Sequence, residues 1–161
     1  MDGSELMSAS ERGQATPLRD VSLGDRFDLS KNDVLLSGVQ AMIRAALAQK
    51  VRDRTVGWNT AGYITGYRGS PLGGVDMTAW KATSALAAHE VTFEPGLNED
   101  IAATAIWGAQ QAHLRGQVTL EGVFAMWYGQ GPGLDRSVDV FRHANLAGVA
   151  PNGRHPVAMG D

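Results

Sequence analysis

The chain has 161 residues, 20 of them glycine, and its formal charge is −3 because 17 acidic residues outnumber 14 lysines and arginines. This length suits one globular domain, and the slightly acidic balance disfavours general binders of nucleic acid or of anionic membranes. The absence of cysteine excludes disulfides and cysteine-ligated metal or iron–sulfur sites in this chain, and it fits a cytoplasmic location. No apolar run approaches the length of a transmembrane helix, so we expect no membrane partner.

The N-terminal third is predicted to hold a tail, an irregular segment and a helix. Residues 1–20 are polar and aperiodic, as in a disordered tail, and the predicted domain spans residues 21–161. Residues 21–36 indicate an irregular lead-in with one short strand. From residue 37 to residue 51 the apolar spacing predicts an amphipathic helix. Its inward face would comprise Val39, Met42, Ile43, Ala46, Leu47 and Val51, with Arg44, Gln49, Lys50 and Arg52 outside it.

The middle of the chain alternates between strand and helix patterns. Residues 60–67 are rich in β-formers and are followed by a glycine- and proline-containing loop at 68–74. A helix is predicted over 76–89 and a short alternating strand over 90–94. The inward face of that helix would comprise Met77, Trp80, Ser84 and Ala87.

The C-terminal part continues the alternation. Asn98 is a good N-cap for a helix over 99–114, whose packed face would comprise Ile101, Ala102, Ala105, Ile106 and Ala109. The apolar run 122–128 predicts a strand buried on both faces. A glycine loop at 129–133 leads into a helix over about 134–147, and residues 155–161 begin a last strand.

Alternating strands and helices predict the fold class: α/β, with a parallel sheet and helices on both faces. In such open sheets ligands bind at loops beyond the carboxyl ends of the strands. Three glycine-containing loops, at 68–74, 94–99 and 129–133, follow predicted strands and would gather at that edge. Because the chain ends on a strand, we expect an incomplete sheet.

Sequence spacing alone favours a structural role for most candidate site residues. None of the glycine loops has a phosphate-binding pattern, and each on its own is typical of a tight turn. Glu99 and Asp100 follow the predicted cap and would complement the helix dipole, or one of them would project into a cleft. Adjacent helical positions point about 100° apart, so the two carboxylates cannot share one role. Ser70 lacks a nucleophile motif, and the histidine spacing predicts no metal site.

Longer strings in the chain resemble a known family. NTAGYITGYRGSPLGG, FEPGLNEDIAATAIWGAQ, GVFAMWYGQGPGLDRSVDVFRHANLAG and PVAMGD are similar to the start of the indolepyruvate ferredoxin oxidoreductases, above all the long bacterial fused form. The resemblance runs from about Val21 to Asp161. It implies the front of a pyrimidine-binding domain of the thiamine-diphosphate-binding fold.

The resemblance implies roles for individual residues. Gly69, Ser70 and Pro71 would form the family's strand-end loop beside cofactor and substrate. Glu99 would hydrogen-bond the aminopyrimidine ring of thiamine and serve as the catalytic carboxyl group. The loop with Gly131, Pro132 and Gly133 would form a wall of the cofactor cleft.

The activity implied by the resemblance is the oxidative decarboxylation of indolepyruvate, or of a related aryl 2-oxo acid, to an acyl-CoA. Thiamine diphosphate would be the cofactor, and its Mg²⁺ and the iron–sulfur clusters would be held by parts outside this chain. The expected partners are the remaining domains of the enzyme, coenzyme A, ferredoxin and further copies in a homo-oligomer. The alternative is a truncated, non-catalytic α/β domain that is inert or binds a partner.

Overall fold

The computed structural model describes residues 20–69, 72, 74–116, 119–154 and 157–159, so residues 1–19 of the expected tail lie outside the described residues. The irregular segment at 20–36 contains a short 3-10 helix, Asp25–Phe27, where one strand was expected. The main elements, in chain order, are α1 (Gly38–Thr55), β1 (Thr60–Gly66), α2 (Gly74–Lys81), α3 (Thr83–Ala88), β2 (Val91–Phe93), α4 (Glu99–Gln111), β3 (Gly122–Gly129), α5 (Gly131–Ala147) and β4 (Val157–Met159).

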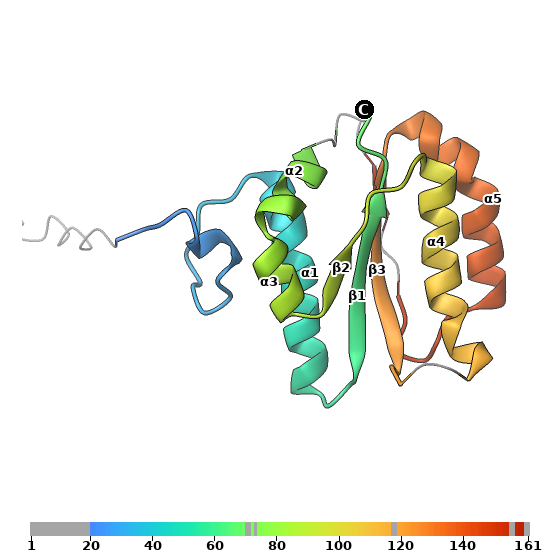
Figure 1. Cartoon of the computed structure of the whole chain (residues 1–161), viewed down its shortest axis with the longest axis horizontal. Helices are drawn as coiled ribbons and strands as arrows, with labels where there is room; N and C mark the ends of the chain where they lie inside the picture. Colours follow the sequence, from blue (N-terminus) through green and yellow to red (C-terminus); the bar gives the residue numbers. More distant parts are fainter. Residues whose placement is uncertain (1–19, 70–71, 73, 117–118, 155–156, 160–161) are drawn as a thin grey trace, which may run out of the picture.

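Within the described residues, four strands form one sheet in the order β2-β1-β3-β4. All three strand pairs are parallel; Gly62 lies beside Val91 on one side and beside Phe124 on the other. Helices α1, α2 and α3 cover one face of the sheet, and α4 and α5 cover the other (Figure 1). The predicted fold class, α/β with a parallel sheet and helices on both faces, is therefore confirmed.

Helix α1 begins with a reciprocal cap and ends in a buried polar cluster. Ser37 accepts a hydrogen bond from the Gln40 main chain while the Gln40 side chain accepts one from Ser37, which satisfies two free N–H groups. The inward face differs from the prediction at its far end, because Lys50 is 1% exposed and Val51 is 40% exposed. The Lys50 ammonium donates to the Thr60 carbonyl and pairs with Glu90 at 2.6 Å, which compensates its burial.

The helix predicted over 76–89 is two helices. The chain breaks at Ala82, and α3 starts there without a side-chain cap. The predicted inward face is also wrong: Met77 and Trp80 are 54% and 46% exposed. The buried side chains are instead Val75, Asp76, Ala79, Ala82 and Leu86.

Helix α4 keeps most of its predicted face, and both of the last two helices differ from the prediction at their ends. Helix α4 ends at Gln111 and continues as a 3-10 turn, Ala112–Arg115. Ile101, predicted to be packed, is 49% exposed. Helix α5 begins at Gly131, three residues earlier than predicted, so the expected loop supplies the first helical turn. Proline is favourable there because a first-turn N–H has no helical partner.

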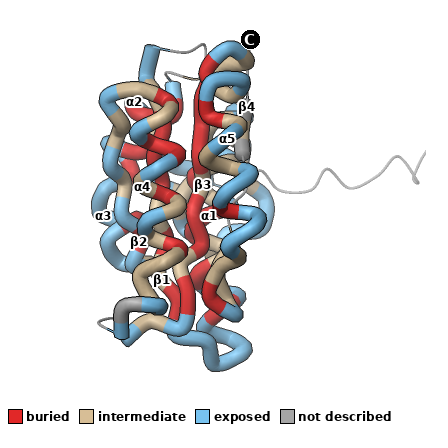
Figure 2. Tube along the Cα trace, turned by 90° about the vertical axis from the view of Figure 1, so that its right-hand side faces the viewer, coloured by how far each residue is buried: buried red, intermediate tan, exposed pale blue. Residues whose placement is uncertain are grey.

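Two apolar clusters lie on opposite faces of the sheet in the part of the chain that the structure describes. One joins α1, α2 and α3 to the sheet around Ile43, Leu47 and Ile64. The other joins α4 and α5 to the sheet around Ala102, Ile106 and Trp127. Strand β3 supplies buried side chains to both clusters, and Figure 2 shows it buried along most of its length.

Candidate functional site

The sheet topology fixes where a ligand would bind. Strands β1 and β3 are neighbours, but the chain leaves β1 toward α2 on one face and leaves β3 toward α5 on the opposite face (Figure 1). Such a switch point opens a crevice at the carboxyl ends of the two strands. The edge that the sequence singled out is therefore the ligand-binding edge of this topology.

The strand ends that lead into the three predicted loops are joined at that edge. The Gly96 main-chain N–H donates to the Gly66 carbonyl at 2.8 Å, so the segment after β2 crosses the end of β1. The Tyr67 N–H donates to the Tyr128 carbonyl at 3.2 Å and joins the ends of β1 and β3. Gly69 is described and exposed, whereas Ser70 and Pro71 lie outside the described residues.

Glu99 is held at the start of α4 by its neighbours. The predicted cap is confirmed, since the Asn98 side chain accepts a hydrogen bond from the Ile101 N–H at 2.8 Å. The buried indole of Trp127 donates to the Glu99 carbonyl at 3.2 Å and ties the helix start to β3. Glu99 itself is only 6% exposed, which is uncommon for a glutamate.

Two glycines leave the space that the Glu99 side chain occupies. A Cβ on Gly133 would lie 2.3 Å from Glu99 Cγ and 2.5 Å from its Oε1, and a Cβ on Gly129 would lie 3.2 Å from Cγ. The carboxyl group therefore lies directly on the first turn of α5. Gly133 is buried, Gly131 is half-buried and Pro132 is exposed in the same turn. Of the predicted site residues, Glu99 and Gly133 are in contact.

Asp100 has a structural role beyond the helix dipole. Its Oδ1 accepts a hydrogen bond from the Ser137 hydroxyl at 3.1 Å, and its Oδ2 pairs with Arg136 at 3.2 Å. These contacts join the starts of α4 and α5. The two adjacent carboxylates thus have different neighbours, as the helical geometry predicted.

A buried acid–phenol pair near the same edge was not predicted. The Tyr128 hydroxyl at the end of β3 donates to Asp76 Oδ1 in the first turn of α2. Burial first, and then the Asp76 carboxylate, raises the pKa of Tyr128 above its ordinary range. Asp76 Oδ2 is buried and has no hydrogen-bond partner among the described residues. A Cβ on Gly66 would lie 2.5 Å from the Tyr128 ring, so that glycine makes room for the phenol.

The only sequence signal for this pair was an acid in the first turn of a helix after a glycine loop. The predicted inward face of that helix was one residue out of register, so Asp76 was placed outside it.

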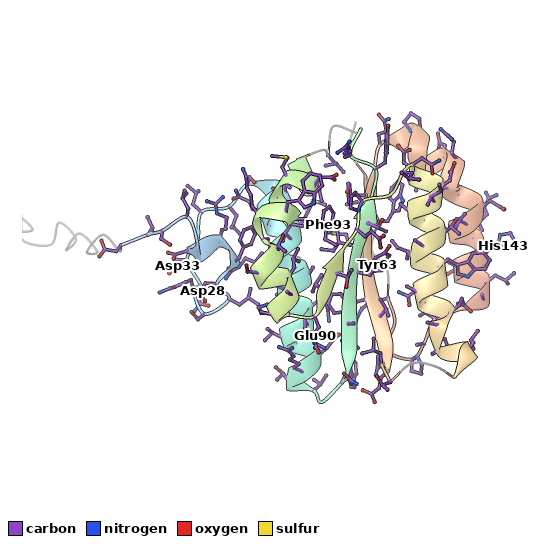
Figure 3. The ribbon with its side chains drawn as sticks, viewed as in Figure 1. Asp28, Asp33, Tyr63, Glu90, Phe93 and His143 are labelled. Carbon is purple, nitrogen blue, oxygen red and sulfur yellow. The ribbon has the colours of Figure 1, made fainter. Side chains whose placement is uncertain are left out.

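A surface groove lies between β1, the loop after β2 and α4. The groove has a volume of about 280 Å³ and is lined by side chains of β1, of the loop after β2 and of α4, among them Tyr63, Thr65, Glu94, Pro95, Ile101 and Ala105. Figure 3 labels Tyr63, which packs beside the cluster under α4. Burial, and then the Glu94 carboxylate, raises the pKa of Tyr63.

The remaining sequence candidates lie apart from this edge. His143 stands on the outer part of α5, where its ring packs at 5.8 Å from that of Trp107 (Figure 3). Trp127, in contrast, lies at this edge: it belongs to the apolar cluster under α4 and α5, and its indole bonds the Glu99 carbonyl. Within the described residues, no group of three histidine, aspartate or glutamate side chains is placed to hold a metal ion. None of the described helices is long and apolar enough to cross a membrane.

Chemically, the edge offers the buried carboxyl group of Glu99 at the start of α4, in addition to the Asp76 carboxylate that the Tyr128 hydroxyl already binds. Such a group can accept or donate one hydrogen bond to a flat polar ligand that enters the crevice between β1 and β3. Searches of family models, curated proteins and solved structures found nothing that matches this chain.

Proposed function

We propose that the chain forms part of a cytoplasmic thiamine-diphosphate-dependent 2-oxoacid:ferredoxin oxidoreductase. The substrate would be indolepyruvate or a related aryl 2-oxo acid, and the product an acyl-CoA. Mg²⁺ and the iron–sulfur clusters would be held by other parts of the enzyme, and ferredoxin would accept the electrons.

The observation that carries the proposal is the placement of Glu99. A glutamate that is 6% exposed, at the start of a helix and beside the switch point of the sheet, is costly unless its carboxyl group has a task there. Three features position Glu99: Asn98 caps its helix, Trp127 bonds its main-chain carbonyl, and Gly133 leaves space for its side chain. A mobile surface glutamate would need none of them.

The residues fit the pyrimidine ring of thiamine in their chemistry. When bound, that cofactor supplies the electron sink for loss of carbon dioxide from a 2-oxo acid. Glu99 would share a proton between its carboxyl oxygen and a ring nitrogen. Trp127 would hold the main chain of Glu99, the space at Gly133 would receive its side chain, and the main chain at Gly69 would border the ring from the end of β1.

The test replaces Glu99 with glutamine in the complete enzyme that the proposal assigns to this chain. Glutamine keeps the shape and the burial but cannot exchange a proton with the ring. We expect exchange of the thiamine C2 proton with deuterated water to slow by about 10²–10⁴, as for loss of a positioned acid–base group. Cofactor affinity should fall less, because the diphosphate would be held elsewhere.

The matched control is Glu94→Gln, which removes an exposed carboxylate from the loop just before α4. That variant should exchange like the wild type. Thermal unfolding of both variants checks that the fold is retained. Equal exchange in Glu99→Gln and wild type would leave Glu99 as a packing residue, and it would favour the non-catalytic alternative.

A further inference from the structure

Helix α5 has a flank whose apolar side chains are covered only in part by the other described elements. On one side Arg136 and Ser137 bond Asp100 of α4, and on the side toward the sheet Phe141 packs edge-on against Trp127 at 5.5 Å. The flank away from α4 carries a shallow, almost wholly apolar groove of about 400 Å³. Its lining residues are Leu134, Val138, Phe141, Arg142 and Asn145.

The spacing of this flank is that of a helix-pairing seam. Leu134, Val138, Phe141 and Asn145 follow one another at intervals of four, three and four residues. That interval pattern places side chains in one line along a helix and is the a/d pattern of coiled coils. Leu134, Val138 and Phe141 are half-buried, so each still presents apolar surface, and the Asn145 amide is at the exposed end.

Two charges of opposite sign border the seam. In this pattern Leu134 and Phe141 are at d positions and Val138 and Asn145 at a positions. Asp135 and Arg142, each directly after a d residue, are therefore at e positions beside the line of apolar side chains, and both are exposed. Neither has an ion pair within the described residues. A charged pair of this kind, with one acid and one base on the same rim, can be complementary to a copy of itself.

An antiparallel copy of α5 satisfies both patterns in one register. If Val138 of each helix lies level with Phe141 of the other, Leu134 also lies level with Asn145. In antiparallel pairs the rim residues that meet are e with e. The same register then brings Asp135 of each copy beside Arg142 of the other, so two ion pairs form on one rim.

We propose that two copies of this chain associate through the Leu134–Asn145 flank of α5 about a two-fold axis. A two-fold interface uses the same patch on both copies, which is what a self-complementary seam provides. The contact is about three helical turns long, so the dimer is a weak one. This inference does not depend on the proposed function.

The first experiment measures the mass of the full chain by sedimentation equilibrium up to about 100 μM, where a small interface is populated. The wild type should approach the dimer mass. Val138→Glu places a carboxylate in the seam and should weaken dimerisation by at least about tenfold, since a buried unpaired charge is costly. The matched control is Leu146→Glu, at a side chain that is 86% exposed and off the seam, and it should dimerise like the wild type. A monomeric wild type, or equal loss in both variants, would overturn the proposal.

The second experiment exchanges the rim charges. Arg142→Asp turns both ion pairs into acid–acid contacts and should weaken the dimer by about tenfold at low salt. Adding Asp135→Arg restores opposite charges and should restore the affinity. If the double variant is as weak as the single one, the charges do not meet in this register and the proposed geometry is wrong.

The third experiment tests whether the two α5 helices run antiparallel. Because the chain has no cysteine, only the introduced thiols can react with a crosslinker. Leu134→Cys and Asn145→Cys are made as separate variants, mixed, and treated with a short bis-maleimide. The antiparallel register predicts crosslinks between the two variants and few within either one. Efficient crosslinking of each variant to itself would instead indicate a parallel pair and contradict the antiparallel register.

Discussion

Gly133 shows how one missing methyl group positions the candidate site. Its hydrogen atom faces the Glu99 side chain at a distance that a Cβ could not tolerate. Both residues are buried, so neither can move aside into solvent. The glycine is required by the close approach of α4 and α5 and not by its own backbone angles.

Gly133→Ala should therefore destabilise the chain by about 1–3 kcal/mol, the usual cost of overpacking. The measurement is urea unfolding followed by circular dichroism. Glu99→Ala in the same chain removes the colliding atoms and should recover most of the loss. The matched control is Gly108→Ala in α4, where a Cβ meets nothing within 4 Å. That change should stabilise by up to about 1 kcal/mol through helix propensity, and a loss as large as that of Gly133→Ala would contradict the steric explanation.

Glu90 combines an unfavourable backbone with a favourable ion pair. Its φ of 53° lies in the left-handed region, where a residue with a Cβ is uncommon. Its carboxylate accepts from the buried Lys50 ammonium and from Arg54 at 3.0 Å. The hydrogen bond from Lys50 first, and then that from Arg54, lower the pKa of Glu90 from its ordinary value of 4.5.

A lowered folded-state pKa means that the stabilisation is present above the ordinary value and is lost as the pH falls through the lowered one. Glu90→Gln should therefore lower the thermal midpoint by several degrees at pH 7 and by progressively less as the pH falls below the ordinary pKa of 4.5. Asp139→Asn is the control, because that carboxylate is 82% exposed and pairs only loosely with His143 at 3.5 Å. A difference for Glu90→Gln that stays constant with pH would show that the ion pair is not the cause.

At the scale of elements, the Asp76–Tyr128 pair joins α2 to the end of β3. The hydrogen bond links a helix on one face to the strand that serves both cores. It also fixes the start of α2, which follows the loop that contains Gly69. The pair thereby connects the stability of the fold to the geometry of the candidate site.

Tyr128→Phe leaves the buried Asp76 carboxylate without this donor and should cost about 1–3 kcal/mol at pH 7. Because the pKa of Tyr128 is raised in the folded chain, the unfolded chain loses its proton first as the pH rises. Wild-type stability should therefore fall above the ordinary tyrosine pKa of about 10, and this slope should be smaller in Tyr128→Phe. Denaturant unfolding between neutral and alkaline pH measures both effects. An equal fall of the unfolding free energy with pH in the two proteins would mean that folding does not raise the pKa of Tyr128.

The sequence predicted the elements better than it predicted their faces. Asn98 as a cap and the apolar run of β3 were confirmed because each depends on local chemistry. The predicted inward face of α2 and α3, which included Met77 and Trp80, was wrong because alanine-rich helices have little periodic contrast between their faces. Lys50 was placed outside because its burial depends on Glu90, which lies on a different element.

At the scale of the whole molecule, the position of the candidate site followed from strand order. Parallel strands predict that the three glycine loops gather at one edge. The loop after β2 does bond the end of β1 there through Gly96 and Gly66, and it contacts the loop after β3 through Glu99 and Gly133. The contact between Glu99 and Gly133 could not be predicted, because it depends on how close α4 comes to α5. The Asp76–Tyr128 pair was missed because its two residues lie 52 positions apart in the sequence and meet only through tertiary packing.

The sheet also determines how the chain should unfold. Strand β3 supplies Phe124 and Tyr128 to one cluster and Ala125 and Trp127 to the other, so neither cluster can be lost while β3 stays intact. Ile43 and Ile106 lie at the centres of the two clusters and are 0% and 1% exposed. We expect Ile43→Val and Ile106→Val each to cost about 0.5–1.5 kcal/mol, and their effects to add in the double variant because the sites are on opposite faces. Circular dichroism and tryptophan fluorescence should give one coincident urea transition in all four proteins. Separate transitions, with Ile43→Val shifting only one of them, would mean that the two faces unfold independently and that β3 does not couple them.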